Sequence, residues 1–371
     1  MQQIADDIVY VDHKELELFM LKGFTALGLP GADAEICSKV LIESDIRGIE
    51  SHGIGRFKMY VDRIRDGILH PVTKTTVIKK TDNTAVIDGN NGMGHVVAYQ
   101  AMQMAIDMAK NANVGMVAVR NSSHFGITGY YPSMAIENDM VGLAFSNARP
   151  SVAPTFGVEP VIGTNPISFG APSDDDYPFL LDIATSIAQR GNIEVYAREG
   201  KETPRGLIID KSGHEQTDSR KLLKKLVGGF ASLLPLGGAG EEMRGYKGYG
   251  LGVMGEILCA SFSGGRFGKA LSGFQGDMKV PHRLGHFFMA VNIESFVPIE
   301  MFKMITGSIM REIRFSEKAP GHDRIYLAGE KEFEMIKKRK KYGVPINAPL
   351  QEIIRNLTAE LGIGEFKFPF L

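Results

Sequence analysis

The stretch Gly163-Thr-Asn-Pro-Ile-Ser-Phe-Gly-Ala-Pro172, followed by Phe179-Leu-Leu-Asp-Ile-Ala-Thr-Ser186, guides the interpretation of the rest of the chain. Its two short apolar runs, residues 167–169 and 179–181, are typical of buried strands. Asp182 directly follows the second run. Burying a carboxylate without a partner is costly, so such a residue is either paired or poised for chemistry. Taken alone, Asp182 would more often be a turn or helix-capping residue, so its role has to be judged from its neighbours.

Composition excludes several classes of protein. The chain has 371 residues, a formal net charge of −1 and a pI near 6.8, so no nucleic acid or anionic membrane is expected as a partner. Cys37 and Cys259 lie far apart, without metal-ligand spacing, which favours a reducing compartment and no metal site. The first seven residues do not resemble a signal peptide, and no apolar run reaches the roughly 20 residues that span a bilayer. A cytoplasmic protein is therefore expected.

Residues 1–70 are expected to form an N-terminal helical lobe. Asp12 precedes a first amphipathic helix in the manner of a capping box, and Gly28-Leu-Pro-Gly31 ends it. A second helix should close near Gly48. The loop Glu50-Ser-His-Gly-Ile-Gly-Arg56 then leads into a third helix, so the lobe presents a polar loop between its second and third helices.

Residues 71–299 are expected to form a mixed-sheet domain. Strands at 75–79 and 84–87, a helix over 96–110 and a strand at 114–119 make a plausible βαβ unit. The turn Asp88-Gly-Asn-Asn-Gly-Met-Gly94 lacks the G-x-G-x-x-G pattern, and no acidic residue closes the following strand, so an ordinary Rossmann site is not favoured. Further expected elements are a helix at 131–138, strands at 141–146, 191–196, 207–210 and 287–293, and an apolar helix at 251–262.

Residues 300–371 should form C-terminal helices, near 300–313, 330–341 and 350–361, that pack back on the lobes. The basic run at 337–341 is interpreted as a solvated helix face, with contact to a cofactor phosphate as the alternative. Because strands and helices are interspersed, the predicted class is α/β with a helical lobe.

Ser51, His52 and Asp182 invite comparison with a hydrolase triad, since a carboxylate can orient an imidazole for proton transfer. No G-x-S-x-G elbow holds Ser51, however, so a proton relay is favoured over acyl transfer. Arg56 follows His52 by about one helical turn, and its guanidinium could bind a carboxylate substrate with two hydrogen bonds. The alternative is a surface arginine beside a capping histidine.

His124 lies in Asn121-Ser-Ser-His-Phe-Gly-Ile-Thr-Gly129, between an expected strand end and helix start, where backbone N–H groups bind anions. It is a candidate for cofactor contact or for acid–base catalysis. The glycine loops at 235–238 and 247–248 are also candidates for binding a phosphate, because their backbone can approach a ligand closely and Lys247 adds a positive charge. Each loop, taken alone, is more often only a turn.

Six motifs in this order resemble the type 2 malate/L-lactate dehydrogenase family. They are Asp45-Ile-Arg-Gly48 with Ser51-His-Gly-Ile-Gly-Arg56 and Tyr60, Asn121-Ser-Ser-His-Phe-Gly126, Gly163-Thr-Asn-Pro166, Asp182-Ile-Ala-Thr-Ser186, Leu234-Pro-Leu-Gly-Gly238 and Lys247-Gly-Tyr-Gly-Leu251. The resemblance runs from about residue 10 to 345. It implies a homodimeric oxidoreductase, with NAD or NADP bound in a mixed sheet that is not a Rossmann fold.

The resemblance also implies roles for individual residues. Ser51, His52 and Asp182 would form the proton relay, with His124 as a second catalytic candidate, and Arg56 and Thr164 would bind substrate. The implied cofactor contacts are His124, Phe125, Gly126, Ile127, Thr128, Pro172, Asp182, Ala184, Leu236, Gly237, Gly329 and Glu330. Two departures from the family pattern stand out: Gly191-Asn192 replaces a usual Gly-Lys pair, and Leu207 follows Pro204-Arg-Gly206 where a tryptophan is common.

The leading hypothesis is reversible hydride transfer between NAD or NADP and C2 of a 2-hydroxy acid, with malate as the favoured substrate. L-lactate, sulfolactate, ureidoglycolate and cyclic imino acids are the alternatives within the family. A Ser-His-Asp hydrolase is a second class of function, and a non-catalytic binding protein, supported by Asn192 alone, is a third.

Overall fold

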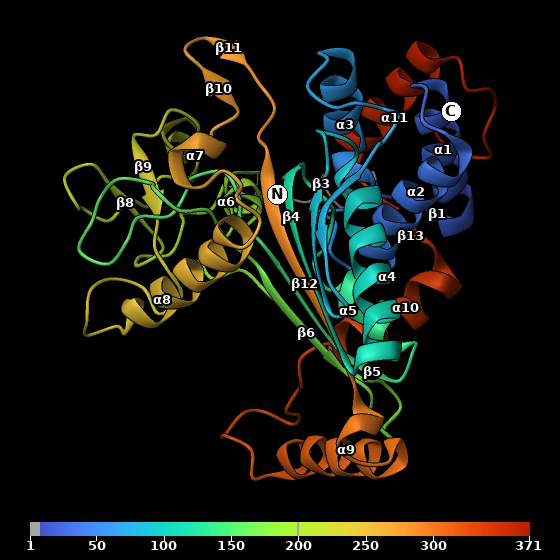
Figure 1. Ribbon diagram of the computed structural model, residues 1–371. Coiled ribbons are helices and arrows are strands. Elements are labelled where there is room, and N and C mark those ends of the chain that lie inside the picture. Colours follow the sequence, from blue (N-terminus) through green and yellow to red (C-terminus); the bar gives the residue numbers. More distant parts are fainter. Residues whose placement is uncertain (1–7, 199) are drawn as a thin grey trace.

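A seven-stranded mixed sheet forms the centre of the molecule, which is known from a computed structural model that describes residues 8–198 and 200–371 (Figure 1). The strand order is β2-β3-β4-β12-β5-β6-β7. In this sheet β3 and β4 run parallel, and the other neighbouring pairs are antiparallel. The strands are β2 (Thr76–Lys80), β3 (Thr84–Asp88), β4 (Val114–Ser122), β5 (Met140–Ser146), β6 (Ile167–Ala171), β7 (Phe179–Ile183) and β12 (Leu284–Asn292). This confirms the α/β class, and a mainly antiparallel sheet differs from the mostly parallel Rossmann sheet.

Helices cover both faces of the sheet (Figure 1). One face packs against α4 (Gly94–Ala112) and α5 (Tyr130–Ile136), and α4 connects β3 to β4 in the expected βαβ unit. The other face packs against α8 (Gly245–Glu256) and its continuation, the π-helical turn η2 (Ile257–Ser261). Successive strand residues face opposite sides, so Phe288 joins the cluster under α4 while Phe287 contacts the one around Cys259. The helix expected at 251–262 thus ends in a π-helical segment.

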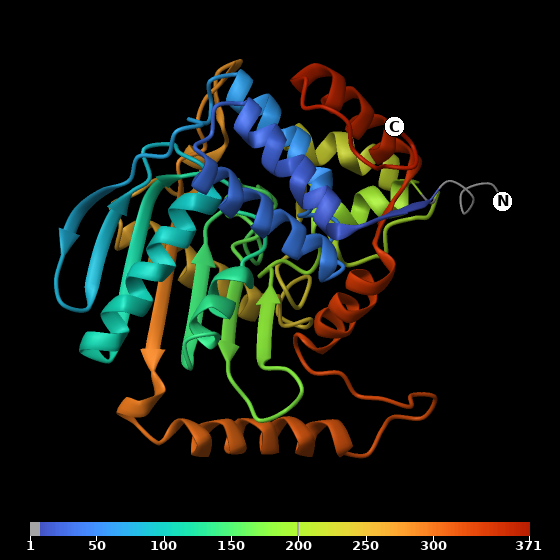
Figure 2. The ribbon, with the colours of Figure 1, turned by 90° about the vertical axis from the view of Figure 1, so that its right-hand side faces the viewer.

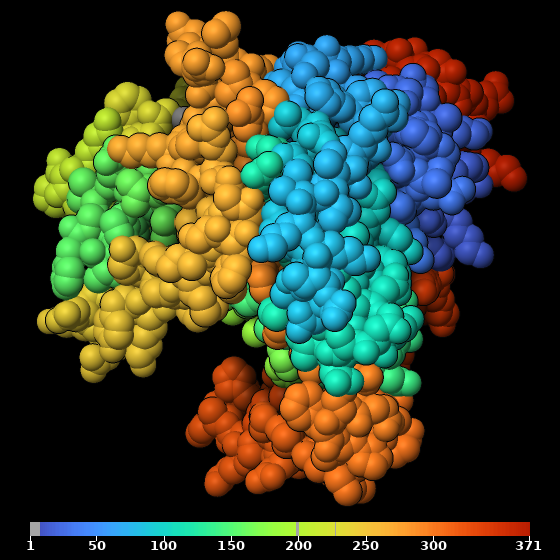
Figure 3. Space-filling view, in the orientation of Figure 1, coloured from blue at the N-terminus to red at the C-terminus, as the bar shows by residue number. Residues whose placement is uncertain are grey.

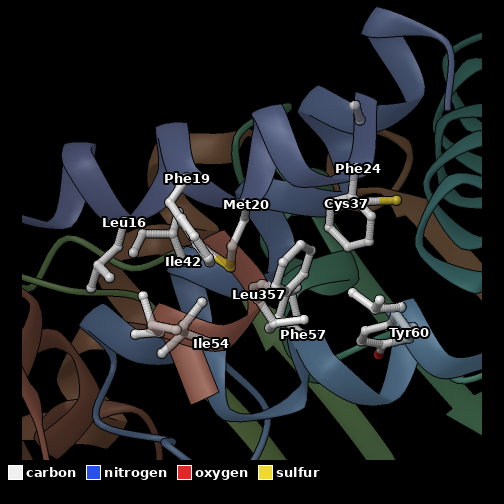
Figure 4. Packing of buried hydrophobic residues seen from close by; sticks show 14 of the residues in the cluster. Leu16, Phe19, Met20, Phe24, Cys37, Ile42, Ile54, Phe57, Tyr60 and Leu357 are labelled. Carbon is white, nitrogen blue, oxygen red and sulfur yellow. The ribbon is translucent and has the colours of Figure 1, made fainter. Parts of the chain in front are cut away.

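The N-terminal helices and the C-terminal segment share one hydrophobic core (Figure 4). Asp12 caps the first helix, because its carboxylate accepts hydrogen bonds from the N–H groups of Lys14 and Glu15. Leu357 packs in the same cluster as Phe19 and Phe57, so the two ends of the chain are held together. The elements are β1 (Val9–Val11), which pairs with β13 (Val344–Ile346), α1 (His13–Ala26), α2 (Gly31–Ile46), η1 (Ile54–Arg56), α3 (Phe57–Arg65), α10 (Glu330–Tyr342) and α11 (Ala348–Leu361).

A smaller lobe with its own hydrophobic cluster stands on the far side of the sheet (Figure 1). It contains α6 (Arg190–Arg198), β8 (Ile208–Asp210), α7 (Ser219–Val227) and β9 (Ala231–Leu233). The strand expected at 191–196 is wrong: these residues belong to α6, which buries Ile193 and carries an Arg190–Glu194 ion pair of 2.9 Å one helical turn apart. The alternating pattern was too short to distinguish strand from helix.

Helix α9 (Ile299–Phe315) lies across one end of the sheet, away from the N-terminal helices (Figure 2). The remaining short elements are η3 (Gly268–Leu271), β10 (Phe274–Gln275), β11 (Met278–Lys279) and η4 (Ile293–Ser295). Among the described helices, none is both long and apolar enough to cross a membrane. Residues 1–7, on which the expectation about a signal peptide rests, lie outside the described part of the chain.

Candidate active site

The loop between α2 and α3 is braced from inside the protein. Asp45, near the end of α2, is buried, and its carboxylate accepts a hydrogen bond from the N–H of Ile54 at 2.7 Å. A Cβ atom added to Gly53 would lie 1.9 Å from Oδ1 of Asp45, so only glycine fits there. On the loop itself, Ser51 Oγ contacts Nδ1 of His52 at 2.8 Å, and Nε of Arg56 donates to the carbonyl of Ser51 at 2.5 Å. The three sequence-predicted residues of this loop are therefore held in one hydrogen-bonded unit.

Substituting Gly53 with alanine tests this brace. The added methyl group has to displace Asp45 or the loop, so we expect a loss of about 1–3 kcal/mol in the free energy of unfolding, together with lower activity. Gly55→Ala is the matched control, because its Cβ would meet its nearest neighbour at 3.4 Å. Denaturant unfolding and steady-state kinetics of both variants measure the difference; equal behaviour of the two would mean that Asp45 does not fix this loop.

Two histidines from distant parts of the chain meet at the site. The rings of His52 and His124 are stacked, with centroids 5.6 Å apart. Burial, and next the charge of Arg56, lowers the pKa of His52 to about 4, and burial also lowers the pKa of His124 well below its usual value. Nδ1 of His124 contacts the Tyr60 hydroxyl at 2.5 Å, and burial raises the pKa of that hydroxyl. Tyr60 is thus the donor, and the proton of neutral His124 resides on Nε2.

Asp182 lies within β7 and does not form the third member of a triad. Its carboxylate accepts a hydrogen bond from the N–H of Gly129 at 2.7 Å. Among the described residues no hydrogen bond joins it to His52. Burial raises the pKa of Asp182 to about 6, with opposing contributions from the Gly129 N–H and Arg47. The hydrolase hypothesis requires an acid bonded to the histidine, and this geometry does not provide it.

A cavity of about 160 Å³ gathers most of the predicted residues. It is lined by Ile49, His52, the turn 124–128, the segment 146–148, Thr164, Pro166, Asp182, Ala184, Gln189 and Leu284. A groove of about 340 Å³ adjoins it and shares Ile49 and Asp182 with it. Gly329 lines the groove, as do Arg47, Lys331 and Glu332. Ile49 and Asp182 thus border both hollows, one beside the histidines and the other beside the start of α10.

Other predicted residues, Ser51 and Arg56 among them, line neither the cavity nor the groove. Pro172 follows the last residue of β6, whereas Thr164 precedes the first. Leu236, which is followed by Gly237, donates its backbone N–H to the carbonyl of Thr185 at 2.8 Å. Glu330 is buried; burial alone would raise its pKa, but hydrogen bonds from the Leu327 N–H, Tyr177 and Arg324 lower that pKa to about 2. The Glu330 carboxylate is thus occupied by protein partners.

Sequence reasoning missed the groups that fix the cavity wall. Oδ1 of Asn165 accepts from the N–H of Ala148 at 3.0 Å, and its Nδ2 donates to Glu256 at 2.7 Å. Asn147 Oδ1 accepts from the N–H of Gly285 at 2.7 Å. The motif Gly163-Thr-Asn-Pro166 contained Asn165 as a signal, whereas Glu256 lay in a segment expected only to be an apolar helix.

The basic run at 337–341 is only partly a solvated face. Its four lysines are exposed, but Arg339 is buried and donates hydrogen bonds to the carbonyl of Asp45 and to the carboxylate of Glu50. Helical periodicity places one residue of such a run toward the core. Arg339 therefore supports the loop that carries His52.

No cluster of three or more His, Cys, Asp or Glu side chains suited to a metal ion occurs within residues 8–198 and 200–371.

His95 is buried beside Tyr60, and neither of its ring nitrogens has a hydrogen-bond partner among the described residues. Burial lowers its pKa to about 3, against about 6.5 in an unfolded chain. Between pH 3 and 6.5 the unfolded state thus binds more protons than the folded state, so His95 makes the free energy of unfolding fall as pH decreases, by about 1.4 kcal/mol per pH unit.

His95→Phe should reduce this dependence of the free energy of unfolding on pH, measured by denaturant unfolding at a series of pH values. An unchanged slope would mean that His95 is not held neutral.

Comparison with known proteins gives a consistent result. A family model described as malate/L-lactate dehydrogenase matches residues 11–355. Malate dehydrogenase of Pyrococcus abyssi is 42% identical over 360 residues, covering 97% of each chain. Malate/(S)-sulfolactate dehydrogenase of Methanothermus fervidus is 36% identical, covering 95% of this chain and 98% of the relative. The crystal structure of malate dehydrogenase from Entamoeba histolytica superposes with a TM-score of 0.93 at 40% identity, covering 96% of this chain and 99% of that one.

Proposed function

The chain belongs to the malate/L-lactate dehydrogenase family, and on that premise we propose that it interconverts malate and oxaloacetate with NAD or NADP. Membership makes it an oxidoreductase that acts on 2-hydroxy acids. Malate is favoured among the family substrates because relatives named malate dehydrogenase match nearly the whole chain. The observation that carries the proposal is the stacked, neutral pair His52 and His124 at a cavity suited to a small acid.

His52 moves the proton that accompanies hydride transfer. A neutral imidazole accepts the hydroxyl proton of the 2-hydroxy acid during oxidation and returns it to the carbonyl oxygen during reduction. Burial holds the pKa of His52 at about 4, and an anionic substrate beside the ring would raise that pKa toward neutrality. His124 offers its Nε2–H to the same oxygen, and Arg56 and Thr164 hold the substrate.

The cofactor lies along β7. When bound, the nicotinamide supplies or accepts the hydride at C2 of the acid. The cavity alone is small, and the neighbouring groove, which shares Ile49 and Asp182 with it, would supply further room for an extended ligand. The turn 124–128 and Ala184 would contact the nicotinamide end, and Gly329 the more distant part. Pro172, Leu236, Gly237 and Glu330 lie outside both hollows, so a direct role for them requires movement of their segments.

A panel of 2-oxo acids assayed with NADH and with NADPH tests the proposed function. Oxaloacetate should cause the largest loss of near-UV cofactor absorbance, ahead of pyruvate, sulfopyruvate and cyclic imino acids. Cofactor binding without turnover of any acid would favour a non-catalytic protein, and faster turnover of another acid would replace malate as the substrate.

The proposed assembly is a homodimer. Helix α9 exposes an apolar stripe at helical spacing, formed by Met301, Met304, Ile305, Ile309 and Ile313, which are 45–54% exposed. A hollow separates α9 from α8 (Figure 3). Soluble monomers rarely leave so continuous an apolar surface uncovered, so a second copy of the chain is the proposed partner.

Light scattering coupled to size exclusion should give the mass of a dimer. Ile309→Glu should shift it toward the monomer, because a charge in an apolar interface loses hydration without gaining a partner. Ile78→Glu is the control, since Ile78 is exposed to a similar degree, 49%, on edge strand β2. A fully active wild-type monomer would contradict the proposal.

A further inference from the structure

A β-bulge in the central strand β12 lies at the wall of the reaction cavity. The pairing of β12 with β4 shifts register between Leu284 and His286, so the regular alternation of side chains is broken there. Leu284 lines the cavity, and His286 is fully buried. A Cβ atom on Gly285, between them, would lie 2.5 Å from the carbonyl oxygen of Cys259, so the bulge requires glycine at this position. Bulges beside active sites commonly redirect a side chain, and here that side chain is His286.

The His286 ring is hydrogen-bonded to the segment 146–148, which lines the cavity. Its Nδ1 lies 2.9 Å from Oγ of Ser146. The same Oγ donates to the carbonyl of Asn147 at 2.8 Å, because a carbonyl only accepts. Nδ1 therefore carries the proton and donates it to Ser146. His286 is neutral in this arrangement, in agreement with its pKa, which burial lowers to about 3.

The face of the same ring packs on the turn 124–128. His286 and Phe125 are stacked, with ring centroids 4.4 Å apart and 28° between the ring planes. Phe125 also stacks on Tyr131, at 4.9 Å and 12°, and the Tyr131 hydroxyl donates to the carbonyl of Phe125 at 2.5 Å. Stacked rings at such separations attract each other in a specific orientation. Because Phe125 follows His124 in the sequence, the stack restrains the part of the turn that carries His124.

The residues proposed to hold the substrate come from other parts of the structure. Arg56 is fixed by a hydrogen bond within the α2–α3 loop, and Thr164 precedes β6. Among the described residues, no hydrogen bond or ring contact joins either of them to His286. A change at His286 should therefore disturb the turn 124–128 and the segment 146–148 while Arg56 keeps its position.

We propose that His286 is a positioning residue, which holds the turn 124–128 against the segment 146–148 so that His124 and the cofactor keep a fixed position relative to the substrate. This inference rests on the proposed function, in which the turn contacts the nicotinamide end. Hydride transfer needs close and aligned reactants, and a misplacement of about 1 Å can reduce the rate on the order of 10²-fold. His286 does not line the cavity, so it acts only through the residues that it contacts.

His286→Leu tests this role, because it removes the ring and the bond to Ser146. We expect kcat with NADH and oxaloacetate to fall about tenfold or more, since the turn is no longer restrained. The dissociation constant of NADH, measured by fluorescence titration, should rise. The KM of oxaloacetate should change by less than about threefold, because Arg56 keeps its position. His286→Phe retains a ring that can stack on Phe125, so it should recover most of the kcat and of the NADH affinity.

Phe287→Leu is the matched control. Phe287 is the next residue of β12 and is also buried, but its side chain packs on the opposite face of the sheet, in the cluster around Cys259. Both leucine variants should unfold at a lower denaturant concentration than the wild type. Only His286→Leu should lose kcat and NADH affinity.

Three results would overturn the proposal. They are unchanged kinetics in His286→Leu, equal kinetic losses in His286→Leu and Phe287→Leu, and a His286→Phe variant that recovers nothing. A loss confined to the KM of oxaloacetate would likewise contradict it. A wild type that binds NADH without reducing oxaloacetate would instead refute the proposed function, while the NADH affinities of the variants would still decide the role of His286.

Discussion

Replacing His52 with alanine should lower kcat by about 10²–10⁴-fold, the usual contribution of a positioned acid–base group. Its ring lines the cavity, contacts Ser51 Oγ at 2.8 Å and stacks on His124. No other titratable ring is held on the braced loop between α2 and α3. The loss should appear in kcat, because the missing proton transfer affects the reaction step more than binding. Stopped-flow and steady-state kinetics with NADH and oxaloacetate provide the measurement.

Two variants control for the His52 result. His214→Ala removes an exposed histidine in the lobe of β8 and β9 and should have no effect. His124→Ala removes the second ring of the stacked pair. If His52→Ala retains near wild-type turnover while His124→Ala loses it, the proton is transferred by His124, and His52 only supports it.

Replacing Arg56 with alanine should reduce kcat/KM for oxaloacetate by roughly 30-fold or more, because removing one partner of a buried charge pair costs about 2–5 kcal/mol. Nε of Arg56 is committed to the carbonyl of Ser51 at 2.5 Å, which fixes the direction of the guanidinium. The terminal N–H groups remain to form the two parallel hydrogen bonds that a carboxylate accepts. Binding of NADH or NADPH should barely change.

Arg56→Lys separates the charge from the geometry. An ammonium group keeps the charge but cannot form the two-pronged contact, so it should recover only part of the lost kcat/KM. A collapse of cofactor affinity in either variant, with substrate KM unchanged, would assign Arg56 to the cofactor instead.

Local patterns in the sequence predicted much of the fold. The cap at Asp12, the break at Gly28 and the turn at Gly67 are local signals, and the first three helices begin and end close to the expected residues. Short or amphiphilic segments were less informative. Residues 191–196 alternate like a strand yet form part of α6, and α7 was not expected although Asp218 caps it. The packing of the small lobe decides the structure of these segments.

The residues of the candidate site likewise fall into those that a local sequence motif identified and those that no local pattern identified. His52, Arg56, His124, Thr164 and Asp182 were identifiable because each lies in a compact motif. Contacts between residues far apart in the sequence left no local pattern to identify them. Arg339 lies nearly 300 residues after Asp45 and Glu50, with which it forms hydrogen bonds, and from the sequence it was interpreted as part of a solvated helix face. The sequence suggested a relay of Ser51, His52 and Asp182, but it could not show that Asp182 accepts a hydrogen bond from Gly129 and none from His52, because that depends on how β7 packs against the α2–α3 loop.

The central claim is direct hydride transfer to C2 of a 2-oxo acid. Its most direct test uses reduced cofactor that carries deuterium at both C4 positions, oxaloacetate and the wild-type protein, followed by mass spectrometry of the malate formed. The proposed mechanism predicts one deuterium at C2 of malate and none in its solvent-exchangeable hydroxyl. Malate that carries only solvent hydrogen at C2, or no malate at all, would contradict it.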